Sequence, residues 1–190
     1  MKSAKTKLMM ITLAISAVCA GNAMALTKEE YKAQNDRISA DYKSAREKCN
    51  TMKDNAKDIC QAEAKGAEKV SKAESEAQYK PSPKNDQKVR EAKADATYNT
   101  AKEKCDDMTG NAKDVCVKDA KAAHTAAKAD AKVAKASADG QSSSSVANVR
   151  KDAAEDKRDA EYKAARERCD SLAGNAKDTC QNDAKAKFNK

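Results

Sequence analysis

Cysteine is the residue type in this chain whose spacing could do chemistry. Six of the seven cysteines form three pairs with ten residues between the partners, and each pair lies in one copy of a repeated unit. In an oxidising compartment such pairs form disulfides, and the competing uses are metal binding and thiol exchange. The pairs are Cys49 with Cys60, Cys105 with Cys116, and Cys169 with Cys180.

The repeated unit predicts two helices joined by a tight turn. Residues 98–121 read YNTAKEKCDDMTGNAKDVCVKDAK, and residues 42–65 and 162–185 are copies of this stretch. Between the cysteines, a residue that tolerates the left-handed conformation precedes an asparagine, which is a strong helix N-cap. These turn and cap residues are Asp54 and Asn55, Gly110 and Asn111, and Gly174 and Asn175.

The position of the turn favours pairing within each unit. The two cysteines lie almost symmetrically about it, so an antiparallel hairpin brings them within disulfide distance. In a straight helix they would be about 16 Å apart along the axis. Such a helix would show both thiols on one face, where they could pair with a partner chain. We favour the hairpin, in which each bridge contributes about 3 kcal/mol.

No other residues form a recognisable reactive set. Zinc sites use closely spaced cysteines such as C-x2-C, and redox-active disulfides also use close spacing, but neither pattern occurs. The single histidine, His124, lies in an alanine-rich helical stretch and is expected to be solvated. We therefore predict no catalytic residue, no metal site and no cofactor, and we interpret the disulfides as structural.

The N-terminal 25 residues have the pattern of a secretory signal peptide. Three lysines precede an apolar run at residues 8–18, and the small residues Ala23 and Ala25 flank the predicted cleavage site after Ala25. The apolar run is too short to span a bilayer, so we expect no transmembrane anchor in the mature chain. Export and paired cysteines together predict a periplasmic protein.

The rest of the chain divides into three hairpins and two linkers. Both prolines lie in the first linker, and the second is rich in glycine and serine. The alanine-rich tail of the second hairpin is expected to fray or to extend as a solvated helix. The predicted divisions are hairpin 26–78, linker 79–87, hairpin 88–137, linker 138–148 and hairpin 149–190.

Apolar residues recur at helical spacing but bury little area. Aromatic residues make up 3% of the chain and charged residues 36%. A large common core is therefore excluded, and we expect an all-α, elongated and partly disordered chain with thin, coiled-coil-like seams. One seam holds Tyr31, Ile38, Tyr42, Ala45, Cys49 and Met52; others hold Tyr162, Ala165, Cys169 and Leu172, and Ala112, Cys116, Ala120 and Ala123.

The charge indicates an envelope surface rather than nucleic acid as partner. The predicted signal peptide holds three of the 38 basic residues and none of the 30 acidic ones, so the remainder carries +5. The charges are interspersed, and no aromatic platform for base stacking occurs. We expect an envelope component as partner, such as a protein, peptidoglycan or an anionic surface. Because thin seams can close within or between chains, self-association stays open.

Two stretches carry a compositional resemblance to known helical proteins. Residues 120–138 (AKAAHTAAKADAKVAKASA) and 151–168 (KDAAEDKRDAEYKAARER) resemble the helical domain of TolA, the envelope-spanning protein of Gram-negative bacteria. They also resemble late-embryogenesis-abundant proteins, which are linked to desiccation tolerance. The tripled cysteine unit is similar to that of uncharacterised exported bacterial proteins, a resemblance that implies no activity.

Three functions remain open on these observations. The first is a non-enzymatic periplasmic protein with a structural or binding role in the cell envelope. The second is a hydrophilic protectant against osmotic or desiccation stress. The third is a cysteine protein that responds to redox state or to metal.

Overall fold

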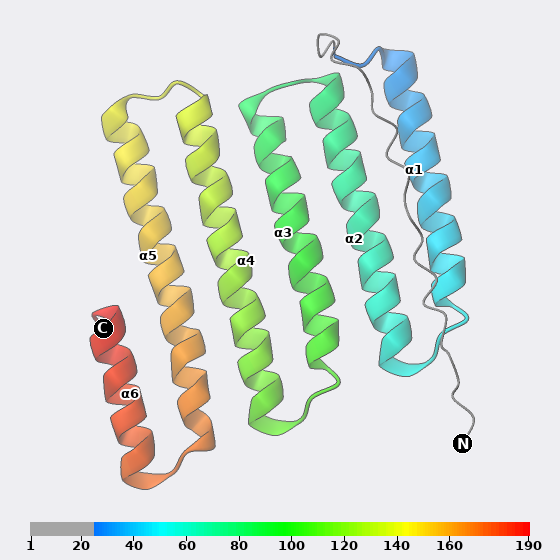
Figure 1. The fold of residues 1–190 in the computed structure, drawn as a ribbon. Coiled ribbons are helices and arrows are strands. Elements are labelled where there is room, and N and C mark those ends of the chain that lie inside the picture. The colour runs from blue at the N-terminus through cyan, green and yellow to red at the C-terminus, as the bar shows by residue number, and fades with distance from the viewer. Residues whose placement is uncertain (1–24) are drawn as a thin grey trace, which may run out of the picture.

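The computed structural model describes residues 25–190 as six α-helices and a short 3-10 turn (Figure 1). The predicted signal peptide therefore lies outside the described residues, apart from Ala25. The all-α class and the helical hairpins are confirmed. The elements are α1 (Lys28–Cys49), α2 (Asp54–Tyr79), α3 (Pro83–Cys105), α4 (Gly110–Ala138), α5 (Ser143–Arg168), η1 (Cys169–Ser171) and α6 (Gly174–Phe188).

Each hairpin turns at the predicted residue, which adopts a left-handed backbone. The φ angles of Asp54, Gly110 and Gly174 are 51°, 56° and 52°. Glycine adopts this region without strain, and aspartate tolerates it better than most residues. A substitution to a β-branched residue at any of the three positions would therefore strain the turn.

The asparagines after these turns are not N-caps, and that prediction is wrong. The cap positions are Lys53, Thr109 and Ala173, with no hydrogen bond from a side chain. The left-handed residue is itself the first residue of the helix, so the asparagine lies inside the first turn. Asn55 instead donates a hydrogen bond to the Glu103 carbonyl of the next hairpin, at 2.7 Å.

The two predicted linkers are shorter than expected, because their ends start helices. Pro83 is at the beginning of α3, where its missing N–H is not needed, and the Ser82 hydroxyl accepts from the Asn85 N–H at 3.2 Å. Ser142 caps α5 in the same way, through the Ser145 N–H at 3.3 Å. Only residues 80–82 and 139–142 connect the hairpins.

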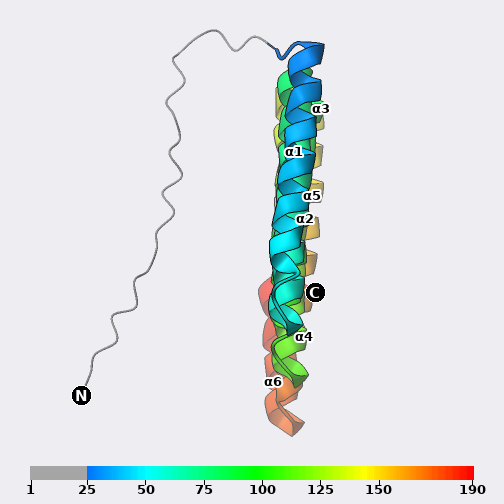
Figure 2. The same cartoon turned by 90° about the vertical axis from the view of Figure 1, so that its right-hand side faces the viewer.

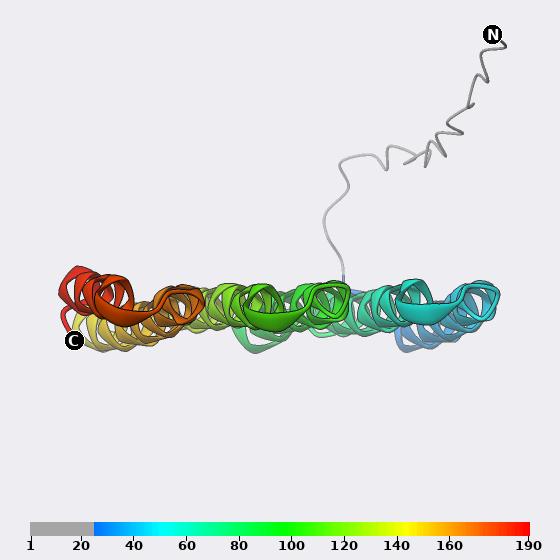
Figure 3. The same ribbon diagram turned by 90° about the horizontal axis from the view of Figure 1, so that it is seen from below.

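The helices form a flat row in chain order, one helix thick (Figures 1, 2 and 3). Each helix packs against its neighbours in the sequence: α1 on α2, α2 on α3, α3 on α4, α4 on α5, and α5 on α6. The hairpins are therefore joined into one array rather than strung on flexible linkers. Both broad faces of the row remain open to solvent.

Small side chains allow the neighbouring helices to approach closely. The alanine-rich tail of α4, expected to fray, packs against α5 and buries Ala129 and Ala136. Between α2 and α3, a Cβ added to Gly66 would lie 2.8 Å from the Cβ of Ala96. Such seams gain packing through proximity rather than through large apolar area.

The two end helices close the row with polar outer sides. In α1, the residues turned away from α2 are exposed and are charged, polar or alanine, as at Asp36, Lys43 and Glu47. In α6, Asp178, Asn182 and Lys185 are likewise exposed. Polar end units are what prevents a helical array from extending by addition of further copies. Within residues 25–190, no helix is long and apolar enough to cross a membrane.

Replacement of Gly66 by leucine should weaken the α2–α3 seam. The new side chain collides with Ala96, and overpacking of this kind costs about 1–3 kcal/mol. The exposed neighbour Ala67 provides the control, because Ala67→Leu should change the unfolding free energy by less than about 0.5 kcal/mol. Thermal unfolding followed by circular dichroism measures both. Equal stability of the two variants would contradict the seam.

Candidate functional site

The three predicted disulfides are present and occupy equivalent places in the hairpins. The Cα–Cα distances are 5.4 Å for Cys49–Cys60, 5.6 Å for Cys105–Cys116 and 5.7 Å for Cys169–Cys180. Each bridge joins the last turn before a hairpin loop to the second turn after it. All three loops lie along the same edge of the row (Figure 1).

Burial shields the disulfides on one side. Cys49, Cys105 and Cys169 are at most 1% exposed, and their partners are half-buried. A thiolate must approach a sulfur along the S–S axis to open a disulfide, so burial of the sulfur slows exchange. The geometry is that of a structural clasp, which fixes the register of each pair of helices.

Ring pairs set the register at the other end of two hairpins. The tyrosine that begins each repeat faces the residue 26 positions later: Tyr98 stacks on His124 with centroids 4.8 Å apart, and Tyr162 lies 6.2 Å from Phe188. The seam predicted to end at Ala123 thus ends one residue later, and Ala123 is exposed. In the first hairpin, Tyr31 stacks on Tyr79 at 4.5 Å instead.

His124 is not the solvated residue that its alanine-rich context predicted. Its Nε2 lies 2.5 Å from Oδ1 of Asp95, and its side chain is 21% exposed. Lys128 Nζ lies 3.8 Å from the same carboxylate oxygen. The equal spacing of Tyr98–His124 and Tyr162–Phe188 could have revealed this contact from the sequence. The group ties α3 to α4 and holds no nucleophile.

Shifted pKa values keep four groups in their ordinary charge states at neutral pH. Hydrogen bonds to the Thr27 backbone, to Lys190 and to Lys177 lower the pKa of Glu30, Asp159 and Asp170, respectively. The Tyr31 hydroxyl donates to Glu76 at 2.7 Å, which raises the pKa of Tyr31. Each shift moves the group away from neutrality, so none prepares an acid or base for proton transfer near pH 7.

One large apolar side chain is exposed at the tip of each hairpin. Met52, Met108 and Leu172 are 44%, 45% and 42% exposed. Met52 and Leu172 were expected to continue the buried seams, but both lie beyond the last helical turn, in the loop. The three tips are therefore equivalent exposed positions along one edge of the row (Figure 1).

Grooves cross one broad face of the row. A groove of about 780 Å³ lies between α2 and α3 beside Val89 and Ala77, and another of about 440 Å³ lies between α3 and α4. The second is lined mainly by alanine, with Tyr98 and His124 on its floor. Within the described residues, no group of three or more histidine, cysteine or acidic residues is arranged to hold a metal ion.

Comparison with known proteins gives no relative from which a function could be transferred. No family model matches the chain, and neither a curated protein nor a solved structure is similar to it. The resemblances noted from the sequence therefore remain untested.

Removal of the third disulfide should release α6. This helix has 15 residues and packs on α5 and the adjoining turn, and isolated helices of that length are marginal in water. In C169S/C180S we expect rapid hydrogen exchange in α6 and tryptic cleavage at Lys177 and Lys185. The removed bridge is worth about 3 kcal/mol, and mass spectrometry follows both changes.

The matched control is C105S/C116S. Both helices of the second hairpin also pack on a neighbouring hairpin, so only the turn near Gly110 should loosen. Full protection of α6 in C169S/C180S would show that the disulfide is not what holds this helix.

Proposed function

We propose that the protein is a non-enzymatic component of the bacterial periplasm that binds or spaces other parts of the cell envelope. The observation that carries the proposal is the flat row itself, in which three disulfide-closed hairpins expose two broad faces. Disulfides indicate an oxidising, non-cytoplasmic environment. The signal-peptide pattern of residues 1–25 supports export to the periplasm with cleavage after Ala25.

A row one helix thick suits a surface for binding better than an enclosed site for catalysis. Its grooves are open, and ion pairs between exposed side chains dominate both faces. The lysine-rich face of α4, with Lys118, Lys121, Lys128 and Lys132, would favour an anionic partner such as peptidoglycan or an acidic protein.

The packed interior favours a folded binding protein over a protectant without a partner. Protectants of the hydrophilic helical type gain helix on drying, whereas here Ala64, Ala94, Ala153 and Ala164 are buried between helices. Burial of one sulfur in each disulfide likewise favours a structural role for the cysteines over a redox response.

The proposal predicts retention on envelope material that depends on the intact row. The chain, expressed with its signal peptide, should be recovered from the periplasm with Leu26 as its first residue. The purified protein should sediment with peptidoglycan sacculi or crosslink to an envelope protein in intact cells. Reduced and alkylated protein is the matched control, because the hairpins lose their clasps without a change in sequence.

Two outcomes would end the proposal. One is recovery of the chain from the cytoplasm with its first 25 residues attached. The other is equal, background-level retention of the oxidised and the reduced protein in both assays.

A further inference from the structure

One broad face of the row carries charged side chains at a constant spacing of eleven residues. Eleven residues are about three helical turns, or about 16 Å, so the two members of each set point in the same direction. The four sets are Glu63 and Glu74 on α2, Lys93 and Lys104 on α3, Asp119 and Asp130 on α4, and Lys157 and Arg168 on α5.

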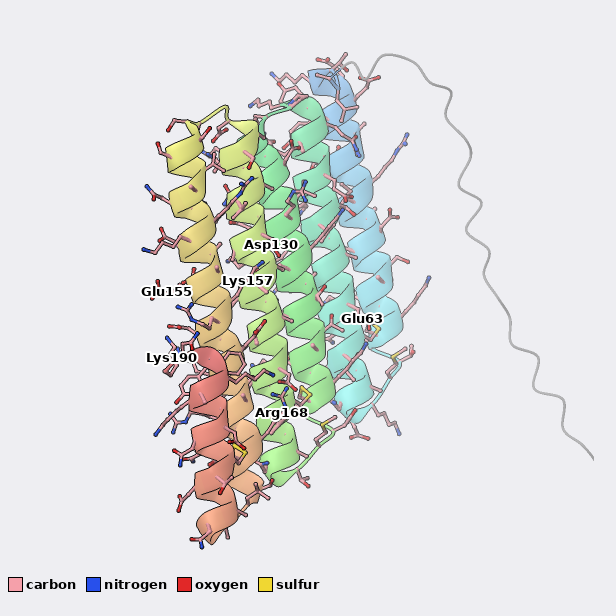
Figure 4. The ribbon with its side chains drawn as sticks, turned by 60° about the vertical axis from the view of Figure 1, so that its left-hand side comes forward. Glu63, Asp130, Glu155, Lys157, Arg168 and Lys190 are labelled. Atoms are coloured by element: carbon pink, nitrogen blue, oxygen red, sulfur yellow. A yellow bond between two sulfur atoms is a disulfide. The ribbon has the colours of Figure 1, made fainter. Side chains whose placement is uncertain are left out.

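These side chains form two lines of ion pairs across the row. In one line, Lys93 Nζ lies 2.7 Å from Glu74 Oε1, and Lys157 pairs with Asp130. In the other, Lys104 lies 3.3 Å from Glu63, and Arg168 pairs with Asp119. Figure 4 labels Glu63, Asp130, Lys157 and Arg168, which come from three different helices of the row.

All four sets lie on the same face. The groove between α3 and α4 is lined by both Lys93 and Asp130. It shares Thr97 and Ala101 with a shallower groove that is lined by Glu63 and Lys104. Asp119 lies three turns from Asp130 on α4 and therefore faces the same way.

Alanine fills the space between the two charged lines. The groove of about 440 Å³ holds six alanines, and Ala123, Ala127 and Thr97 are exposed. We call this surface the alanine face, and it consists of Thr97, Ala101, Ala120, Ala123 and Ala127 with the eight charged residues around them. On the opposite face, α4 presents lysines instead, so the alanine face is the less costly one to remove from water.

The order of the charges makes the alanine face complementary to itself. From α2 to α5 the sign runs negative, positive, negative, positive, and it therefore reverses about the midline between α3 and α4. A two-fold axis along this midline places α2 opposite α5 of a second copy, and α3 opposite α4. Every acidic set then meets a basic set, as an isologous interface requires.

The heights of the charges along the helices also match. The register set by Cys105–Cys116 places Lys93 level with Ala129, beside Asp130. Glu74 and Lys157 pair with these two residues, so the four charges share one height. An axis across the helices would instead set each helix opposite itself, with like charges in contact. The pattern thus selects one arrangement of the two copies.

The surface is large enough for a stable dimer. The four central helices have 23 to 29 residues. With about 1.5 Å per residue and about 9 Å between axes, they cover on the order of 1,200 Å². Specific interfaces bury about 800 Å² on each partner. The ion pairs within the chain are exposed and individually weak, so the side chains can turn to the partner.

We propose that two copies of this chain associate through their alanine faces into a two-layered dimer. The two-fold axis runs parallel to the helices between α3 and α4. The dimer leaves the lysine-bearing faces on the outside, and it does not rest on the proposed role in the envelope.

Charge reversal on one side and then on the other tests this dimer. E63K/E74K sets positive α2 against positive α5 of the second copy, and K157E/R168E sets two negative surfaces together. Each variant alone should dimerise about 100-fold more weakly than the natural chain, as measured by sedimentation equilibrium. An equimolar mixture should dimerise again, because both contacts of the mixed pair are then between opposite charges.

K118E/K132E is the matched control, since it makes the same charge change on the opposite face. It should dimerise as the natural chain does, and circular dichroism should show that all variants keep their helix content. A monomeric natural chain would overturn the proposal. So would a dimer that survives both reversals, a mixture that stays monomeric, or a control that dissociates.

Discussion

The disulfide clasp at the turn of each hairpin is the constraint on which the rest of the row depends. The clasp joins two helices whose facing residues are mostly alanine, and such a seam buries little apolar area. Each bridge fixes the register of its hairpin at the loop end. That register brings Tyr98 against His124 and Tyr162 against Phe188 at a constant 26 residues. In the third hairpin, a helix of only 15 residues is held in this way.

The flatness of the row follows from how apolar residues are distributed around each helix. Interior helices need two narrow seams on opposite sides, and alanine and glycine provide them with close contact, as at Gly66 and Ala96. The broad faces are left to charged residues and exposed alanines. The terminal helices need only one seam, and their outer sides are polar. A row built in this way offers surface rather than an interior, which is why its function is sought in what its faces contact.

The hairpins could be predicted because their determinants are local in the sequence. The cysteine spacing and the residue before each asparagine were sufficient for the turns and the pairing. The association of the hairpins could not be predicted, since it depends on small residues such as Gly66 and Ala129 that look featureless in one dimension. The linkers were drawn too long because Pro83 and Ser142 were taken as breakers, although each begins or caps a helix. The contact of His124 with Asp95 was missed because the seam was assigned to Ala123.

The central claim is that three local disulfides hold one row of hairpins, and disulfide mapping tests it most directly. Lys53, Lys113 and Lys177 lie between the cysteines of the three pairs, so trypsin applied without reduction separates each pair into two peptides that only the bridge joins. Mass spectrometry of the exported protein should find Cys49 linked to Cys60, Cys105 to Cys116 and Cys169 to Cys180. Free thiols, bridges between different hairpins or bridges between chains would contradict the account.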